Sequence, residues 1–188
     1  MKLRALMVAG VVLAFAGSPA FAGQQPTTAE KADRTMTGAK APDAVFITKA
    51  AGAGMAEVEL GRMGVEKASS DEVKKFAQRM VDDHSKANDE LKTLAQSKNV
   101  TLPDAADPHV KAMQDKLSKM PSASFDRAFM QAMVTDHRKA VNDFRLASKA
   151  AKDPEVKAWA AKTLPTLEDH LKLAQSTATA VGTSGSKK

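Results

Sequence analysis

Two stretches of the chain, FAQRMVDDHSKA at residues 76–87 and FMQAMVTDHRKA at residues 129–140, follow one pattern, F-x-Q-x-M-V-x-D-H-x-K-A. A third, shorter copy, DHLK, stands at residues 169–172. Three of the four histidines of the chain therefore occupy the same sequence context. Self-similarity of this kind indicates repeated helices that share one packing role.

The residues around each tetrad predict helices, because apolar side chains recur there at alternating spacings of three and four. We predict four long helices, over residues 44–68, 71–98 and 125–151 and from residue 154 onward. The chain is rich in helix-forming residues, and no stretch alternates as a strand would. The fold class is therefore predicted to be all-α.

Helix boundaries are indicated by capping residues. Asp43 is predicted to cap the first helix, and Ser69 with Glu72 forms a capping box for the second. Asp153 is predicted to cap the fourth helix. Pro165 lies inside the fourth helix, where it is predicted to kink the helix or break it.

The connection over residues 99–124 is much longer than an antiparallel helix pair needs. It is interrupted by prolines, and residues 109–120 are predicted to form a short helix within it. A connection of this length can cross the whole bundle, which makes helices two and three parallel. We predict one four-helix bundle over residues 42–181, followed by a flexible tail at 182–188.

The N-terminus has the pattern of a secretory signal peptide, with a basic start, a short apolar stretch and an A-x-A site ending at Ala22. Cleavage before Gly23 would leave a disordered lead-in over residues 23–41. The chain has no cysteine, which excludes a lipid-modified cysteine and any disulfide. The sequence thus predicts a soluble protein that is periplasmic or otherwise exported, without a transmembrane segment in its mature part.

The charge pattern argues against nucleic-acid binding. The formal net charge is +6, but lysines alternate with acidic residues, as on solvated helix faces. The predicted seams contain no cysteine and no well-placed serine for a catalytic triad, and the chain has no glycine-rich phosphate loop. A non-enzymatic role is therefore favoured, and the chain is compatible with a homo-oligomer.

Each predicted seam carries one ionisable residue: Glu57, His84, His137 and His170. Their distances from the two predicted turns differ by only one to four residues, which corresponds to about 2 to 6 Å along a helix. One carboxylate and three imidazoles in one layer form a suitable ligand set for a transition metal such as zinc, copper or iron. The alternative is a hydrogen-bonded Glu-His network without metal.

The aspartate before each histidine points about 100° away from it, toward a neighbouring helix. Asp83, Asp136 and Asp169 are therefore candidates to accept the spare N–H of a histidine on that helix. Met80 and Met133 lie one turn before His84 and His137, and they are either thioether ligands for copper or core filler. Because free imidazoles take up protons near pH 6.5, metal binding is predicted to weaken below about that pH.

The first predicted helix contains four glycines, at positions 52, 54, 61 and 64. They either let a neighbouring helix approach closely or keep space open beside Glu57, and we favour close approach.

The stretch over residues 43–174 resembles the bacterial domain-of-unknown-function family 4142. The resemblance is carried by MAEVELG at 55–61, FAQRMVDDH at 76–84, FD at 125–126, DH at 136–137, and LP at 164–165 with His170. It implies an exported, ferritin-like four-helix bundle, of a kind often labelled as a membrane or outer-membrane protein. It implies no activity, and the Glu-x-x-His signature of di-iron bundles is absent.

Two functions follow from these observations. The first is a periplasmic bundle that binds a transition metal in its core for metal buffering or stress protection. The second is a non-catalytic structural or interaction module of the cell envelope, in which the Glu-His layer only fixes the helix register.

Overall fold

The structure, a computed structural model, describes residues 40–106 and 108–184. Over these residues it contains helices and no strand: α2 (Ala41–Lys67), α3 (Asp71–Ser97), α4 (Pro108–Ser118), α5 (Ser122–Ala150) and α6 (Pro154–Ser184). The all-α prediction is confirmed, with helix ends within one turn of those predicted. The signal peptide, nearly all of the lead-in and residues 185–188 lie outside the described residues. Helix α6 continues to Ser184, beyond the predicted start of the tail.

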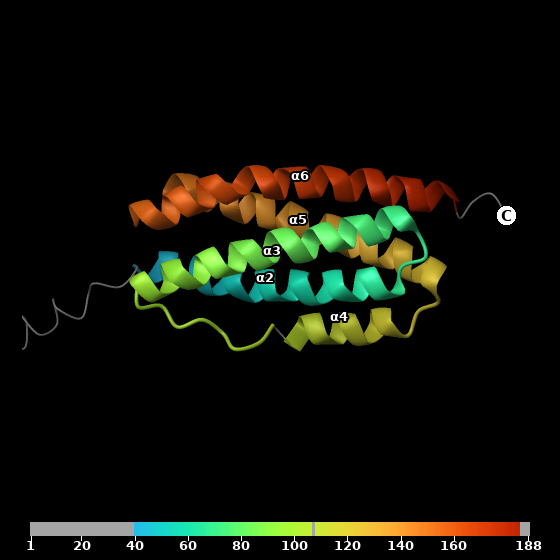
Figure 1. Cartoon of the computed structure of the whole chain (residues 1–188). Coiled ribbons are helices and arrows are strands. Elements are labelled where there is room, and N and C mark those ends of the chain that lie inside the picture. Colours follow the sequence, from blue (N-terminus) through green and yellow to red (C-terminus); the bar gives the residue numbers. More distant parts are fainter. Residues whose placement is uncertain (1–39, 107, 185–188) are drawn as a thin grey trace, which may run out of the picture.

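The chain forms two antiparallel hairpins, α2 with α3 and α5 with α6, joined by a crossover that runs along the outside of the bundle (Figure 1). Helix α4 lies in this crossover and packs on α2 and α5. The crossover places the start of α5 beside the start of α3, so these two helices run in the same direction. The predicted ferritin-like bundle with its long crossover is confirmed.

The parallel helices α3 and α5 lie diagonally across the bundle rather than side by side. Between the two hairpins, α2 instead packs beside α5, and α3 packs beside α6. Helices α3 and α5 meet through side chains that reach the bundle axis, such as Phe76 and Phe129, whose ring centroids are 6.3 Å apart. In the part of the chain that the structure describes, no helix has the length and apolar character needed to cross a membrane.

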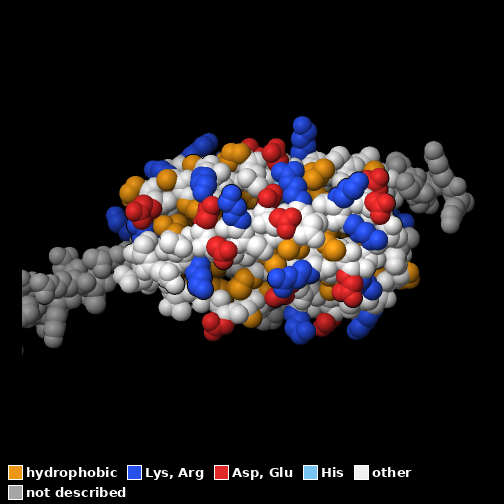
Figure 2. Space-filling view, in the orientation of Figure 1, with side chains coloured by type: hydrophobic (Ala, Val, Ile, Leu, Met, Phe, Trp, Pro, Cys, Tyr) orange, Lys and Arg blue, Asp and Glu red, His pale blue; other side chains and the backbone are white. Residues whose placement is uncertain are grey.

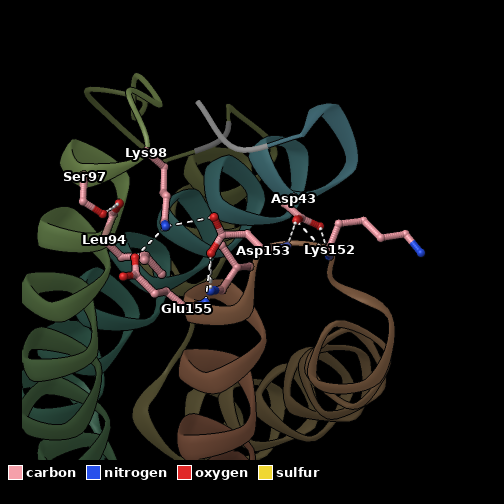
Figure 3. A network of polar contacts seen from close by, with 8 residues as sticks. Asp43, Leu94, Ser97, Lys98, Lys152, Asp153 and Glu155 are labelled. Atoms are coloured by element: carbon pink, nitrogen blue, oxygen red, sulfur yellow. Dashed lines mark hydrogen bonds and ion pairs between the residues drawn. The ribbon is translucent and has the colours of Figure 1, made fainter. Parts of the chain in front are cut away.

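The sequence predicts that Asp43 caps its own helix, but in the structure it does not. Helix α2 begins earlier, with Pro42 in its first turn, and Lys40 at the N-cap makes no side-chain bond. The buried Asp43 carboxylate instead accepts hydrogen bonds from the backbone N–H groups of Lys152 at 2.9 Å and Asp153 at 2.7 Å (Figure 3). It thereby fastens the α5–α6 turn to the start of α2.

A second aspartate fastens the other turn in the same way. Asp126, buried near the start of α5, accepts hydrogen bonds from the N–H groups of Ser69 at 3.0 Å and Ser70 at 2.9 Å. The N-cap of α3 is Ser70, whereas the predicted capping box used Ser69. Ser69 instead bonds to Asp126. The Ser70 hydroxyl donates to Glu72, at 2.6 Å. Each hairpin thus supplies the acceptor that secures the turn of the other.

Lys98 joins the hairpins at the end of the bundle where α3 finishes. Its ammonium group lies 2.8 Å from the Asp153 carboxylate and 2.5 Å from that of Glu155 (Figure 3). Asp153 also accepts hydrogen bonds from the N–H groups of Glu155 at 2.9 Å and Val156 at 3.2 Å. The predicted cap of the fourth helix is therefore confirmed.

Pro165 does not break α6, which continues through it as one helix. Proline cannot donate to the carbonyl four residues earlier, which here belongs to Ala161. Both Pro165 and Ala161 are exposed, so water can satisfy that carbonyl. The sequence predicts either a kink or a break at Pro165, and the break is wrong.

Close helix approach explains the glycines of α2. A Cβ atom at Gly64 would lie 2.7 Å from the Ala77 Cβ and 2.8 Å from the Phe129 Cζ. At Gly61 a Cβ atom would lie 2.9 Å from the Ala77 carbonyl oxygen. The interpretation favoured from the sequence is correct at these positions. The three-four spacing of Phe46, Ala50 and Ala53 predicts that these residues form the buried side of α2. This is wrong in the first half of the helix, where Ile47 is buried and Ala53 is exposed.

The core consists of two hydrophobic clusters, one toward each end of the bundle. The first contains Phe76, Phe125 and Phe129, and the second contains Phe144 and Trp159. On every long helix, the ionisable seam residue falls in sequence between the residues of the two clusters. The packing therefore places a polar layer in the middle of an apolar core. On the face shown in Figure 2, basic and acidic side chains are interspersed, as the sequence predicted.

Candidate metal centre

Three histidines from three helices converge in the polar layer. His84 of α3, His137 of α5 and His170 of α6 have ring centroids 5.3 to 5.6 Å apart. One nitrogen of each ring lies within 4.8 Å of one nitrogen of the other two. Their exposed fractions are 8%, 1% and 1%, so water screens them little. The predicted shared layer therefore exists.

The separation of two imidazole nitrogens fits a single metal ion. The Nε2 atoms of His84 and His137 are 3.4 Å apart. Two imidazole ligands at about 2.0–2.1 Å from a tetrahedral metal are about 3.3–3.4 Å apart. An ion between the two nitrogens would need little rearrangement of either ring.

Hydrogen bonds to pure acceptors fix the tautomers of two rings. The Nδ1 atom of His137 lies 3.0 Å from the Met133 carbonyl oxygen, so this nitrogen carries the proton. Its Nε2 atom, which faces His84, therefore presents a lone pair when the ring is neutral. The Nε2 atom of His170 lies 2.8 Å from the Asp83 carboxylate, which places the proton on Nε2. The Nδ1 atom of His170 then carries a lone pair, and it is buried without a hydrogen-bond partner.

Asp83 reaches a histidine of another helix, in the way expected of the tetrad aspartates. The sequence analysis missed its second partner, Arg79, whose Nε atom lies 3.2 Å from the same carboxylate. The i,i+4 spacing of these two residues was the available signal. Burial alone would raise the pKa of Asp83, but hydrogen bonds from His170 and Arg79 outweigh it and lower that pKa. Asp83 is thus held as an anion beside His170.

The other two tetrad aspartates have different surroundings. Asp136 is half-buried, and its negative charge acts on Glu57. Asp169 is exposed on α6. Asp83 supports a histidine directly, because its carboxylate lies at hydrogen-bond distance from a ring nitrogen of His170.

Glu57 of α2 lies beside His137, but among the described residues the ligand atoms that lie within 4.8 Å of one another belong to the three histidines alone. The Glu57 Oε1 atom lies 3.7 Å from the Nδ1 atom of His137, beyond an ordinary hydrogen bond. Its Oε2 atom is buried without a hydrogen-bond partner. Burial, assisted by the negative charge of Asp136, raises the pKa of Glu57 to about 8. At neutral pH this side chain is mostly protonated, and a metal ion would displace that proton on binding it.

The three imidazoles are neutral at neutral pH. Burial and the neighbouring rings lower the pKa of His84 to about 3, and burial with His170 lowers that of His137 to about 4. Burial also lowers the pKa of His170, although the Asp83 carboxylate opposes this. Neutral imidazole is the form that binds metals. The threshold near pH 6.5, expected for free imidazoles, is therefore too high for the folded protein.

The two candidate thioether ligands lie in the core. Met80 and Met133 are fully buried, and both belong to the cluster that contains Phe76 and Phe129. Met133 contributes to the layer through its backbone carbonyl, which orients His137.

Solved structures of similar fold include metal-bound proteins. A structure described as CopM in the Cu(II)-bound form is 21% identical, with a TM-score of 0.63, and the match covers 73% of this chain and 96% of that one. CopM in the Cu(I)-bound form is 23% identical, with a TM-score of 0.60, over 71% of this chain and 93% of that one. A DUF305 fragment from Deinococcus radiodurans is 16% identical, with a TM-score of 0.66, over 77% and 98%.

These similarities concern the fold, since all three identities are low. No curated protein sequence matches this chain significantly. The sequence model of one family, described as a domain of unknown function (DUF4142), matches residues 25–177, which include every residue of the polar layer. The chain belongs to the DUF4142 family.

Proposed function

We propose that this protein is an exported bundle that binds one transition metal ion through His84, His137 and His170. The observation that carries the proposal is the convergence of three buried, neutral imidazoles whose nitrogens lie within 4.8 Å of one another. Glu57 is the fourth candidate ligand, because its unpartnered carboxyl oxygen lies in the same layer. The role that best fits such a site is metal buffering or protection against metal stress in the periplasm.

Copper is the favoured ion. Imidazole nitrogen binds copper, zinc and iron, and only one of the four candidate ligands is a carboxylate, unlike the acid-rich sites of di-iron bundles. The similar CopM structures are described as bound to copper(I), copper(II) and silver. These ions share a preference for nitrogen and softer ligands, which supports copper over the harder cations.

The hydrogen bonds around the rings would tune such a site. Asp83, by accepting the N–H of His170, increases the electron density on the other ring nitrogen and fixes the ring orientation. The Met133 carbonyl does the same for His137. Each ring would then meet an ion with little loss of conformational freedom.

A specific observation also favours a metal-free network. The existing bonds from His137 to Met133 and from His170 to Asp83 already satisfy one nitrogen of each ring. A layer that only fixes helix register would use the same bonds. The protein would then be a non-catalytic envelope module.

Calorimetric titration separates the two functions. Untagged, metal-stripped protein is titrated at neutral pH with copper(I), copper(II), zinc and cobalt. We expect saturable binding of one ion, steep loss of affinity in His84→Ala, His137→Ala and His170→Ala, and a raised Tm when the ion is present, because the ion binds the folded state. His109→Ala, which removes the one histidine outside the tetrads, is the matched control and should bind as the wild type does. Folded protein that shows no saturable heat with any of these ions would refute metal binding and leave the register role.

Export is tested on the intact chain. We expect the mature protein to begin at Gly23 and to appear in the periplasmic fraction, because the A-x-A site ends at Ala22. Mass spectrometry of the purified protein gives its N-terminus. A chain that retains its first 22 residues would contradict this proposal.

A further inference from the structure

The bundle contains a cavity of about 1090 Å³, partly open to solvent, that extends from the polar layer into the second hydrophobic cluster. Its walls are formed by the long helices, and residues of the crossover, including Pro103 and Met113, cover part of it. The lining runs from Phe46 to Leu60 on α2, which is about 21 Å along a helix. The volume is large compared with that of a single metal site, so the metal centre does not account for it.

Small residues on facing helices make this space. Ala50 and Ala56 of α2 and Ala140 of α5 all line the cavity. Helices α2 and α5 approach each other much less closely than the two partners within either hairpin. A concave space of this size with a mainly apolar lining is typical of small-molecule sites.

The far end of the cavity is aromatic. The ring centroid of Phe144 lies 5.1 Å from that of Phe46 and 5.3 Å from that of Trp159. The centroids of Phe46 and Trp159 are 6.1 Å apart. Trp159 is 9% exposed, and its Nε1–H is buried without a hydrogen-bond acceptor. An unpaired buried donor is unusual, and a molecule that offered an oxygen there would satisfy it.

Several of the charges along the cavity are compensated, and the Lys49 side chain is exposed to water. Lys139 pairs with Asp143, and Asp83 is paired with Arg79 and His170. A charged molecule that entered the apolar part would therefore lose its hydration without gaining a free counter-charge.

We propose that this cavity binds an uncharged, elongated apolar molecule with one hydrogen-bond acceptor oxygen, of the class of alkyl ketones, esters and alcohols. The alkyl part lies along the alanine-lined wall, and the oxygen accepts the N–H of Trp159. Binding does not require a metal ion, because the polar layer forms only one end of the cavity.

The test uses 2-decanone as the probe, with metal-stripped, full-length protein. Trp159 is the only tryptophan of the chain, so its fluorescence reports directly on the cavity. We expect a saturable change in emission together with a rise in Tm. Decanoate and decylammonium, which have the same chain length and opposite charges, should each bind at least about tenfold more weakly, because a charge is costly to bury.

Two cavity-filling variants from opposite walls and one matched control give the location. Ala140→Leu and Ala50→Leu should each reduce the Tm response to 2-decanone at least about tenfold in apparent affinity, since the added methyl groups occupy the space of the probe. Ala158→Leu, at an exposed position of α6 outside the cavity, should leave the response unchanged. Trp159→Phe should weaken binding by several-fold while keeping an aromatic ring, as expected for the loss of about one hydrogen bond.

The proposal is overturned if the wild type shows neither a fluorescence change nor a Tm shift, or if the charged analogues bind as tightly as 2-decanone. Equal responses in the wild type and in a folded filling variant would overturn it as well. Metal titration of Ala140→Leu on the same preparation keeps this result separate from the metal proposal, because that variant retains all three histidines and Glu57.

Discussion

Asp83 and Asp169 occupy the same place in two copies of one tetrad, yet they have different surroundings. Asp83 lies against His170 at 2.8 Å and against Arg79 at 3.2 Å, whereas Asp169 is exposed. The difference arises because α3 and α6 are neighbours and the side chain before His84 faces that neighbour. The repeat thus specifies the histidines more strictly than the aspartates beside them.

This difference yields a prediction with its own control. Asp83→Asn replaces the anion that accepts the N–H of His170, so metal affinity should fall by about tenfold. Asp169→Asn should change the affinity by less than about twofold, because that exposed side chain acts on His170 only weakly, through its charge. Calorimetric titration of both variants with copper gives the comparison. Equal losses would show that the aspartates act through general charge rather than through the His170 hydrogen bond.

At the scale of single residues, the sequence was sufficient to predict the layer itself. Glu57, His84, His137 and His170 could be found because helix periodicity and distance from a turn together give depth in a bundle. The tautomers and the pKa values could not be predicted. They depend on the Met133 carbonyl and on burial, which only the packed structure supplies.

At the scale of elements, the glycines of α2 set how closely the helices pack. Gly64 lies against Ala77 and Phe129, whereas the nearest atom to a Cβ at Gly52 would be the Pro103 Cγ, at 3.9 Å. Two glycines of one helix therefore differ in whether a methyl group fits. The sequence alone does not show which of these two glycines is crowded by its neighbours.

Alanine at these two positions should have opposite effects. Gly64→Ala should lower the free energy of unfolding by about 1–3 kcal/mol, because the methyl group overlaps neighbouring atoms. Gly52→Ala should raise it by about 1 kcal/mol, because alanine favours the helix and the space is open. Urea denaturation of both variants measures the change. A stabilising Gly64→Ala would contradict the close packing of α2 against α3 and α5.

The reciprocal clamps are the feature of the elements that the sequence analysis missed. Asp43 bonds to residues 109 and 110 positions away, and Asp126 to residues 56 and 57 positions away. Local capping rules find an acceptor only within a few residues of its helix start, so they assigned Asp43 to its own helix. Contacts of this range follow from the tertiary arrangement alone.

Removing one clamp should destabilise the whole bundle. Asp126→Ala leaves the N–H groups of Ser69 and Ser70 without their acceptor, so we expect a loss of about 2–4 kcal/mol in the free energy of unfolding. Asp104→Ala, at an exposed position of the crossover, is the control and should cost less than about 0.5 kcal/mol. Thermal and urea unfolding followed by circular dichroism provide both values. Similar values for the two variants would show that the clamp contributes nothing to stability.

At the scale of the whole molecule, the polar layer makes stability depend on pH in two opposite ways. His84 and His137 have folded-state pKa values of about 3 and 4, below the ordinary 6.5, so the unfolded chain takes up protons first. Their contribution is present above about 6.5 and is lost as the pH falls. Glu57 has a raised pKa of about 8, so its contribution is present below 4.5 and is lost as the pH rises through 8.

The metal-free protein should therefore be most stable near pH 6.5, with each group contributing a slope of about 1.4 kcal/mol per pH unit in its own window. Below that pH the two histidines outweigh Glu57, and above it Glu57 acts alone. Urea unfolding at several pH values between 5 and 8.5 gives the profile. In Glu57→Gln the decline above pH 6.5 should disappear. A decline of the same size in that variant would show that another group is responsible.

The polar layer also joins the two halves of the chain, since Glu57 and His84 belong to the first hairpin and His137 and His170 to the second. An ion held by these side chains would keep all of its ligands only while the two hairpins stay together. Its residence time would then be governed by the opening rate of the bundle rather than by the strength of any single coordination bond. A clamp such as Asp126, which is not itself a candidate ligand, would then set how long the ion is retained.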